Sequence, residues 1–578
     1  MTKAIYAELP NEPTFVELLR VFRQVHQIIV HDPQNGVDAD YSQFFTDLLR
    51  MREILYESLP KDMFDEQNII REESPYVFIL SRGDYEFIIA SFAILSIGGA
   101  LVPLSTEISP EEASQLLHRC KSTTILAGQD YLQLAAEVKE HAASHDLCVT
   151  VLPISIKVSP VIDPHSGCVK INPDMRVESH RPGVLLFTSG TSGPPKAVVH
   201  TRAFNESHTK ILYGDVFLSH RPPHWISGML PLISLPLRGA RLEVTSSNPS
   251  ILWERLKTGG VTILAGTPYI WTPMMKYFDD HLSCLPLEKL NAYIRGAQGL
   301  RVAYVTGSMP HPSLLRFWRG ILGQKVKVAY GATEFGGYGT CTTDDTDENL
   351  ELCIGRPLPG VTIHLSEGDH GEILIKSPSL FSHYLGDEAA TRAAFSIDGF
   401  YRSGDLAHRI GDDYILDGRA SGDFIKCQGY KVQILKVEQA LKDLPFISEG
   451  CILQVPDSNN SGRVAALVRF EDSVKAVQVG CHGSFATYLQ FLREHLARTL
   501  PAYMLPTVLR ILQDGEEIPQ TVSNKVIRKK AVDQYFPLSK DSELPTDVEL
   551  WDPETCHDNW IPRAWDWAGL QTNITSAL

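Results

Sequence analysis

Residues 188–196 read TSGTSGPPK and directly follow the apolar run VLLF at residues 184–187. Glycine residues in this segment let backbone N–H groups approach a polyphosphate closely, and its hydroxyl side chains add further donors. Lys196 adds a positive charge. A Walker loop needs Gly-Lys-Ser/Thr, whereas here proline precedes the lysine and alanine follows it. The segment therefore predicts a phosphate-binding loop of another kind after a buried strand, and a plain surface turn is the alternative.

Short β-rich runs alternate with helical stretches along the middle of the chain. The runs after the loop are VTILAG at residues 261–266, LRVAYVTG at 300–307 and VKVAYG at 326–331. This alternation is typical of layered helices and strands, so the expected fold class is α/β. At 578 residues the chain exceeds the size of one compact core, and a large lobe with a smaller second lobe is expected.

The most apolar stretch, residues 87–104, is close to the length that spans a membrane. Gly98, Gly99 and Pro103 interrupt it, and glycine and proline commonly end regular elements. The stretch therefore predicts a buried helix, a turn and a short buried strand. No membrane span is expected.

Composition divides the chain into four expected segments. The first shows helical spacing of apolar residues, for example from Phe15 to Val30. Glycines and charges in LDGRASGDFIK, residues 416–426, predict a hinge near Gly418. The segment after Phe536 is acidic and rich in tryptophan, which favours docking on its own protein, with a partner as the alternative. The expected segments are an N-terminal helical cap of the large lobe at 1–75, the rest of that lobe at 76–417, a small lobe at 418–535 and a tail at 536–578.

Charge and cysteine content bear on partners and location. The formal net charge is −16, so attraction to nucleic acid or anionic lipid is not expected. Ten cysteines without a CxxC pair are typical of a reduced intracellular protein with free thiols. The first residues show no secretory pattern, and the final Ser-Ala-Leu only weakly resembles a peroxisomal address. The expected location is the cytoplasm, with the peroxisome as the alternative.

Further motifs follow the loop in a fixed order. They are YGATEFGG at residues 330–337, GEI at 371–373, FYRSGDLA at 400–407, GRASGDFIKCQGYKV at 418–432 and IPQTVSNKVIRK at 518–529. With TSGTSGPPK, they resemble the motifs of the adenylate-forming, AMP-binding superfamily over about residues 75–535. This superfamily includes acyl-CoA synthetases, 4-coumarate–CoA ligases, firefly luciferase and peptide-synthetase adenylation domains. The resemblance implies a large layered α/β lobe and a small mobile α+β lobe, with the active site between them.

The resemblance implies a site for ATP and Mg²⁺. Thr333 is expected to bond the α-phosphate and Glu334 to hold Mg²⁺, a hard cation that binds carboxylate and phosphate oxygens. Asp405 is expected to accept hydrogen bonds from both ribose hydroxyls. Lys525 is expected to bridge the substrate carboxylate and the α-phosphate during adenylation. The other nucleotide-binding residues implied by the resemblance are Thr188, Ser189, Gly190, Thr191, Ser192, Gly193, Lys196, Gly307, Ser308, Met309, Tyr330, Gly331, Ala332, Arg419, Lys426 and Gly429.

The predicted hinge carries a further resemblance. Arg419 is expected to contact phosphate or ribose, and the hinge to let the small lobe rotate between the two half-reactions. The spacing from Arg419 to Asp423 is similar to that of malonyl-CoA synthetases, as are the following Ile425-Lys426 and Gly429-Tyr430-Lys431. The family usually has threonine where Ser403 stands. The hinge therefore favours a small acidic substrate.

The acyl pocket is expected near His224 and Trp225, which resemble a gate beside the acid. His224 is for that reason a catalytic candidate beside Lys525, Thr333 and Glu334, and an ordinary buried His-Trp pair is the alternative. Arg301 is the nearest candidate to bind a second carboxylate, one position away from the arginine of malonyl-type relatives.

The predicted function is that of an acyl-CoA synthetase. It would join a carboxylic acid to AMP and then transfer the acyl group to coenzyme A, and the acid is expected to be a small di- or tricarboxylic acid. One alternative is a stand-alone adenylation enzyme that loads a separate carrier protein, and another is a luciferase-like oxygenase. A non-catalytic descendant is disfavoured, because Lys196, Glu334, Asp405 and Lys525 are all present.

Overall fold

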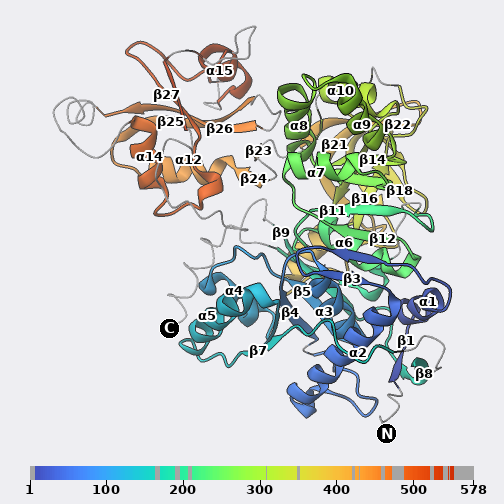
Figure 1. The fold of residues 1–578 in the computed structure, drawn as a ribbon. Coiled ribbons are helices and arrows are strands. Elements are labelled where there is room, and N and C mark those ends of the chain that lie inside the picture. Colours follow the sequence, from blue (N-terminus) through green and yellow to red (C-terminus); the bar gives the residue numbers. More distant parts are fainter. Residues whose placement is uncertain are drawn as a thin grey trace. The chain divides into compact units, whose positions relative to one another are not determined.

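The protein is described by a computed structural model over residues 7–73, 75–162, 169–188, 196–205, 211–307, 309–310, 312–347, 350, 352–419, 424–427, 430–456, 462–471, 487–520, 526–537, 545 and 547–551. The chain divides into two compact units, one reaching Gly418 and the other running from Arg419 onward. The division falls at the segment whose glycines predicted a hinge. Both units combine helices and strands, which confirms the expected α/β class (Figure 1).

The first unit contains a sheet that carries both ends of the glycine-rich loop. Its strand order is β20–β10–β9–β5–β4–β6–β7. Strands β10 and β20 are antiparallel to their neighbours, whereas β9, β5, β4, β6 and β7 are parallel. The bounds are β4 (Tyr76–Leu80), β5 (Ala100–Pro103), β6 (Thr124–Ala127), β7 (Thr150–Pro153), β9 (Pro182–Thr188), β10 (Lys196–Thr201) and β20 (His383–Tyr384).

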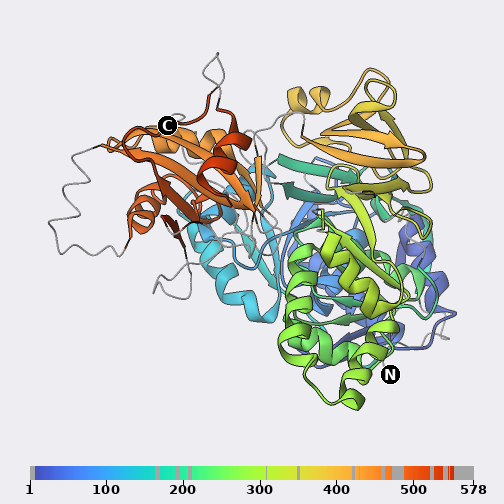
Figure 2. The same cartoon turned by 90° about the horizontal axis from the view of Figure 1, so that it is seen from above.

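A longer sheet of the same unit has the order β18–β19–β21–β22–β17–β16–β15–β14–β13–β11–β12–β2–β3. Strands β12, β11, β13, β14 and β15 are parallel, so their C-terminal ends share one edge. Strands β18, β19, β21, β22 and β17, yellow in Figure 2, form one end of this sheet. The bounds are β2 (Val30–Asp32), β3 (Val37–Ala39), β11 (Val216–Ser219), β12 (Arg241–Val244), β13 (Ile263–Gly266), β14 (Val302–Thr306), β15 (Lys327–Ala332), β16 (Gly337–Cys341), β17 (Cys353–Pro357), β18 (Thr362–Leu365), β19 (His370–Lys376), β21 (Tyr401–Ile410) and β22 (Asp413–Arg419).

Helices surround both sheets of the first unit (Figure 1). They are α1 (Pro13–Phe22), α2 (Tyr41–Ser58), α3 (Tyr85–Ser96), α4 (Pro110–Arg119), α5 (Leu132–Ala143), α6 (Ile226–Ser234), α7 (Pro249–Lys257), α8 (Pro268–Tyr277), α9 (Leu287–Gln298), α10 (Pro312–Leu322) and α11 (Glu388–Ala393). A small sheet pairs β1 (Ala7–Asn11) with β8 (Val169–Arg176).

The apolar stretch at residues 87–104 folds as predicted. Every residue of α3 is buried, Gly98 turns the chain with a φ of +77°, and β5 follows. The strands expected from residue 184 onward are also present, as β9, β13, β14 and β15. In the described residues, no helix is both long and apolar enough to cross a membrane.

Three buried tryptophans fix the helices beside β13 and β14. Trp253 of α7 stacks on Trp318 of α10 with ring centroids 5.4 Å apart. The indole N–H of Trp271 in α8 donates to the carbonyl of Tyr304 in β14, 2.9 Å away. Because packed aromatic side chains occupy well-defined positions, this cluster fixes the strand that ends just before Gly307.

The helical spacing of apolar residues from Phe15 to Val30 forms a helix only in its first part. Helix α1 ends at Phe22, and Val30 pairs with Leu242 in the longer sheet. Val25 and Ile29 are buried after the helix has ended. Burial by a different element reproduces the apolar spacing of a helix, so periodicity alone does not find this boundary.

The second unit is built around a four-stranded sheet with the order β25–β26–β27–β28. Strand β28 belongs to the acidic tail and pairs antiparallel with β27. Next to it, the guanidinium of Arg493 lies over the Trp551 ring, 4.0 Å from its centroid. The described part of the tail therefore docks on its own unit. The bounds are β23 (Phe424–Cys427), β24 (Tyr430–Gln433), β25 (Ile447–Pro456), β26 (Gly462–Phe470), β27 (Val508–Ile511), β28 (Val548–Leu550), α12 (Ile434–Lys442), α14 (Tyr488–Leu496) and α15 (Arg528–Tyr535).

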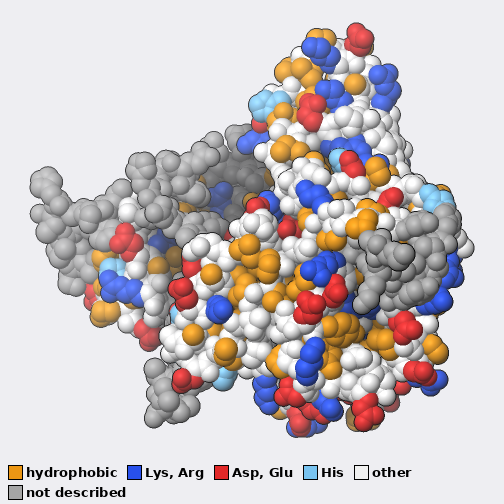
Figure 3. Space-filling model, turned by 60° about the horizontal axis from the view of Figure 1, so that its bottom comes forward, with side chains coloured by type: hydrophobic (Ala, Val, Ile, Leu, Met, Phe, Trp, Pro, Cys, Tyr) orange, Lys and Arg blue, Asp and Glu red, His pale blue; other side chains and the backbone are white. Residues whose placement is uncertain are grey.

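On the face shown in Figure 3, acidic and basic side chains are interspersed, and the coloured basic ones form no continuous patch. Binding to a nucleic-acid backbone needs such a patch.

The described cysteines are free thiols, as the sequence predicts.

Asp84 caps the N-terminus of α3 and is buried beside other acidic residues. Its carboxylate accepts a hydrogen bond from the backbone N–H of Phe87 at 3.1 Å. Burial raises the pKa of Asp84 from 3.8 to about 6, and the charge of Asp32 also raises it. A carboxyl group whose pKa is higher in the folded protein ionises more readily in the unfolded chain. The folded protein therefore loses stability as the pH rises toward the folded-state pKa.

Replacing Asp84 with asparagine is therefore expected to stabilise the protein more at pH 8 than at pH 4.5. Asparagine also caps helices, and it carries no charge to bury. The difference between the two gains should be about 2 kcal/mol, measured by urea unfolding of both proteins at both pH values. Asp62→Asn, at an exposed position, should show no such difference. A gain that is equal at both pH values would contradict the prediction.

Candidate active site

The glycine-rich loop joins the ends of two neighbouring strands. Strand β9 ends at Thr188, β10 begins at Lys196, and these two residues are cross-strand partners. The loop residues Ser189, Gly190, Thr191, Ser192 and Gly193 lie outside the described residues. The hairpin thus brings the first and last residues of the motif together at one end of the sheet.

Tyr384 links Lys196 to Glu334. Strand β20 pairs with β10, which brings the tyrosine to this end of the hairpin. The Lys196 Nζ lies 4.5 Å from the centroid of the Tyr384 ring, and the Tyr384 hydroxyl donates to Oε1 of Glu334 at 3.1 Å. Burial and the charge of Glu334 raise the pKa of Tyr384 well above its ordinary value, so the hydroxyl stays protonated. Lys196 and Glu334 are therefore parts of one local cluster.

Backbone contacts hold Thr333 and Glu334 in place. The ring N–H of buried His200 donates to the Thr333 carbonyl at 2.8 Å, and the Phe381 N–H donates to the Glu334 carbonyl at 2.7 Å. Burial lowers the pKa of His200 to about 4, so this histidine is neutral at physiological pH. These contacts fix the backbone from which the side chains of Thr333 and Glu334 extend.

Glycines surround these residues because neighbouring backbone comes too close for a side chain. A Cβ at Gly331 would lie 2.2 Å from the Gly337 carbonyl oxygen. Gly336 has a φ of +77°, and a Cβ there would lie 2.5 Å from Ser379. The glycines of YGATEFGG are therefore required by the local backbone geometry.

The RSGD motif meets the YGATE motif at Asp405. The Tyr330 hydroxyl donates to Oδ2 of Asp405 at 2.7 Å, across 75 positions of sequence. The Asp405 backbone N–H donates to Oγ of Ser403 at 3.0 Å. Serine thus provides the hydroxyl that the usual threonine would provide, without its methyl group.

Several candidate residues lie at the C-terminal edge of the parallel strands. His224 follows β11, Gly307 follows β14, and Tyr330, Gly331 and Ala332 end β15. Ligands of parallel sheets commonly bind at this edge. Gly307 has a φ of +86°, which favours glycine at this turn. The half-buried Met309 follows the same turn.

His224 is buried at the start of α6, and its ring centroid lies 5.5 Å from that of Trp225. Burial lowers the pKa of His224 to about 3. The imidazole is then neutral at physiological pH and a weak base. Its surroundings suit a wall or gate of a pocket better than proton transfer.

Arg301 does not fit the second-carboxylate role that the sequence suggests. It precedes β14, at the edge opposite to Gly307, and its guanidinium binds Asp215 at 2.5 and 3.0 Å. Although burial raises the pKa of Asp215, the hydrogen bond and charge of Arg301 bring it below its ordinary value. Arg301 is therefore neutralised by its own chain.

The remaining candidates lie partly outside the description. Ser308, Gly429 and Lys525 are not among the described residues. Arg419 is the last residue of β22, and Lys426 lies in β23. Only the backbone of these two residues is described.

The described residues hold no group of three or more His, Cys, Asp or Glu that could bind a metal by itself. A Mg²⁺ ion that keeps phosphate oxygens and water needs only one or two carboxylates from the protein. Glu334 offers such oxygens beside Lys196, in a glycine-lined surrounding. The donor set therefore fits Mg²⁺ bound together with a nucleotide.

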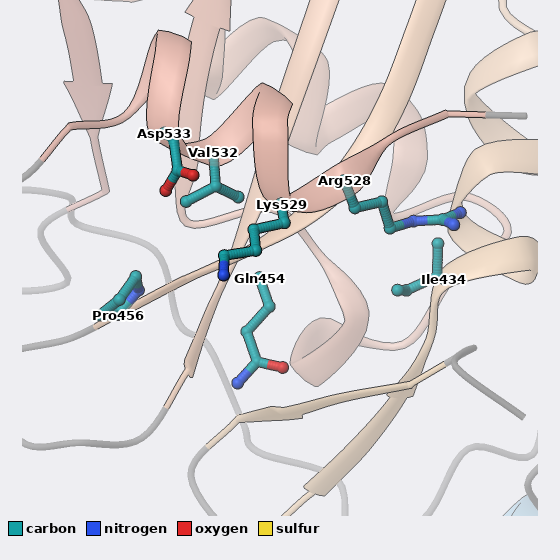
Figure 4. A pocket seen from close by; sticks show the side chains of 7 residues that line it. All are labelled: Ile434, Gln454, Pro456, Arg528, Lys529, Val532 and Asp533. Carbon is teal, nitrogen blue, oxygen red and sulfur yellow. The ribbon is translucent and has the colours of Figure 1, made fainter. Parts of the chain in front are cut away.

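The second unit contains a separate cavity of about 300 Å³ (Figure 4). Arg528 on its wall binds Glu438 at 3.0 Å and is thereby neutralised. None of the candidate nucleotide-binding residues lines this cavity. Its lining residues are Ile434, Gln454, Pro456, Arg528, Lys529, Val532 and Asp533.

Comparison with known proteins identifies the family. Residues 66–385 match the AMP-binding enzyme family. The chain belongs to this family. It is 34% identical over 539 residues to the acyl-CoA ligase oryP of Aspergillus oryzae, covering 92% of this chain and 93% of that protein. It is 28% identical over 525 residues to the mitochondrial malonate–CoA ligase of Homo sapiens, covering 81% and 84% respectively.

Solved structures of other proteins have a similar fold. A malonyl-CoA ligase bound to methylmalonyl-CoA and AMP has a TM-score of 0.65 at 21% identity, covering 89% of this chain and all of that one. The o-succinylbenzoate CoA synthetase of Bacillus subtilis has a TM-score of 0.67 at 19% identity, covering 89% and 98%. At these identities the likeness concerns the fold, which agrees with the sheets and helices described above.

Tyr384 is a site residue that sequence reasoning missed. It lies in a strand of only two residues, HY, which has no clear β pattern. Its importance follows from its pairing with β10, which is far away in sequence. The sequence gives no local signal for such a contact.

Proposed function

We propose that this member of the AMP-binding family is an acyl-CoA ligase that activates a small di- or tricarboxylic acid with ATP and transfers it to coenzyme A. The observation that supports this best is the joining of three motifs in one unit. Tyr384 connects Lys196 with Glu334, and Tyr330 connects the motif of Glu334 with Asp405. These motifs are the ones by which the sequence resembles adenylate-forming enzymes.

Each described residue has a role that its chemistry suits. Lys196 provides a positive charge for ATP phosphates, and Asp405 accepts hydrogen bonds from ribose hydroxyls. Glu334 would hold Mg²⁺ with phosphate oxygens, and Thr333 would donate to the α-phosphate. Magnesium, when bound, would neutralise charge on the phosphates of the leaving pyrophosphate.

The reaction would proceed in two transfers. A carboxylate oxygen of the acid attacks the α-phosphorus of ATP, the bond to the β-phosphate breaks, and pyrophosphate leaves. Lys525 would stabilise the charge that builds up between the acid and the α-phosphate. The sulfur of coenzyme A then attacks the acyl carbon, AMP leaves, and the thiol proton is released.

The substrate class rests on two supports. The hinge spacing resembles that of malonyl-CoA synthetases, and relatives include a malonate–CoA ligase covering most of the chain. Both supports favour an acid substrate that is small and carries a second carboxylate.

The test is pyrophosphate release from ATP and Mg²⁺ with fatty, aromatic, malonic-type and tricarboxylic acids, each with and without coenzyme A. Turnover with a small di- or tricarboxylic acid, faster with coenzyme A and yielding a thioester, is the expected result. Pyrophosphate release that coenzyme A does not change would instead point to a carrier protein or to oxygen as the second reactant. Preference for fatty or aromatic acids would overturn the proposed substrate class.

A further inference from the structure

Arg221 carries a buried positive charge for which the described residues provide no carboxylate. It follows His220 directly after β11, and the residue is partly buried. All three guanidinium nitrogens are inaccessible to solvent, and among the described residues only the phenol of Tyr338 comes close enough to interact with them. Removing a charged group from water without a partner is costly, so such a group calls for an explanation.

Two other arginines of this unit are paired with carboxylates. Arg202 binds Glu12 at 2.5 Å and the carbonyls of Gly99 and Leu95 at 3.0 and 2.7 Å. Arg301 binds Asp215. A carboxylate thus balances the charge of these two arginines, whereas none of the described residues does so for Arg221.

The phenol of Tyr338, on β16, interacts with the Arg221 guanidinium, although no hydrogen bond of ordinary length joins them. Burial lowers the pKa of Arg221, and Tyr338 offsets part of this effect. Burial also raises the pKa of Tyr338, so its hydroxyl is neutral and does not balance the guanidinium charge. Among the residues that the structure describes, no negative charge balances the guanidinium.

The position of Arg221 fits a ligand-binding role. It lies at the C-terminal edge of the parallel strands, three residues before His224, and Tyr338 lies four residues after Glu334. The backbone is tightly held: a Cβ at Gly83 would lie 2.8 Å from the Arg221 carbonyl oxygen, and one at Gly228 only 2.1 Å from that of Pro222. A fixed backbone suits a residue that must present a charge at a defined place.

We propose that Arg221 binds the second carboxylate of the acid substrate. This inference rests on the proposed function and names the residue that would recognise the diacid. A guanidinium can bind a carboxylate through two parallel N–H···O bonds, which a monocarboxylic acid of the same size would leave unmade. Binding such a diacid would provide the charge that the ligand-free site lacks, so selectivity arises from the cost of leaving Arg221 unpaired.

The experiment compares wild type, Arg221→Met and Arg221→Lys. The acids are malonate, succinate and glutarate, each beside its monomethyl ester, which keeps the activated carboxylate and removes the second charge. For the preferred diacid, Arg221→Met is expected to lower kcat/KM by roughly 30- to 100-fold, because a buried charge pair is lost. The KM values for ATP and coenzyme A and the rates with the ester should stay unchanged. Arg221→Lys should lie between the two, because it keeps the charge but not the paired bonds.

A thermal-shift measurement separates this inference from the proposed function and from misfolding. Wild type should be stabilised by the diacid and not by its ester, and Arg221→Met by neither. Without ligand, Arg221→Met should melt no lower than wild type, because methionine removes an unpaired buried charge. An equal loss with diacid and ester, or a marked drop in the ligand-free melting temperature, would overturn the inference. Diacid binding that depends on Arg221, without pyrophosphate release from any acid, would support the inference and refute the proposed function.

Discussion

Replacing Glu334 with glutamine is expected to slow pyrophosphate release by about 10²- to 10³-fold at saturating ATP. Glutamine has the same shape and keeps an oxygen that can accept the hydrogen bond from Tyr384. It lacks the negative charge that a hard cation prefers. The loss should be partly recovered at high Mg²⁺ concentration, so the measurement is the rate of pyrophosphate release across a magnesium titration.

Tyr384→Phe is the matched control for this prediction. It removes the hydroxyl that donates to Glu334 and keeps the ring beside Lys196. Because it leaves the carboxylate in place, its loss should be smaller, about 10-fold or less. If Glu334→Gln were no slower than Tyr384→Phe, or if its magnesium dependence matched that of wild type, Glu334 would have no direct role in holding the metal.

The sequence predicts the local elements around the site well. Strand β9, the hairpin residue Lys196 and strands β13 to β15 occur where apolar β-branched runs and glycines place them. Such features are local, because each run and its turn chemistry act within a few residues. Helix α1 shows the limit: it ends at Phe22 although the apolar spacing continues, and Val30 instead pairs with Leu242, which is far away in sequence.

The details of the candidate site depend on contacts between distant residues. A resemblance in motifs gives Glu334 and Asp405, but it does not give Tyr384, which reaches Glu334 through the pairing of β20 with β10. Arg301 looks suited to bind a carboxylate in the sequence, yet Asp215 already occupies its guanidinium. Arg221 looks ordinary in the sequence, because only the structure shows that its charge is buried without a carboxylate among the described residues. Charge pairing is decided by the fold, not by the residue type.

Replacing Lys525 with alanine is expected to separate the two half-reactions. By resemblance, this lysine neutralises charge between the acid and the α-phosphate, where it builds up only during adenylation. Pyrophosphate release should therefore fall by about 10²- to 10³-fold. Thioester formation from a supplied acyl-adenylate should fall by less than about 10-fold, because that step forms no bond to phosphorus. Single-turnover assays of each half-reaction measure the two effects.

Lys529→Ala is the control for Lys525→Ala. It removes a positive charge from the same unit, at the wall of the 300 Å³ cavity, where none of the candidate nucleotide-binding residues lies. Both half-reactions should then stay within about threefold of wild type, because Lys529 is not among the residues expected to contact ATP or the acid. Equal losses in both half-reactions of Lys525→Ala would mean that the lysine supports the fold or general binding. A loss confined to adenylation would assign Lys525 to the first transition state, because only an interaction made there can slow one step and leave the other.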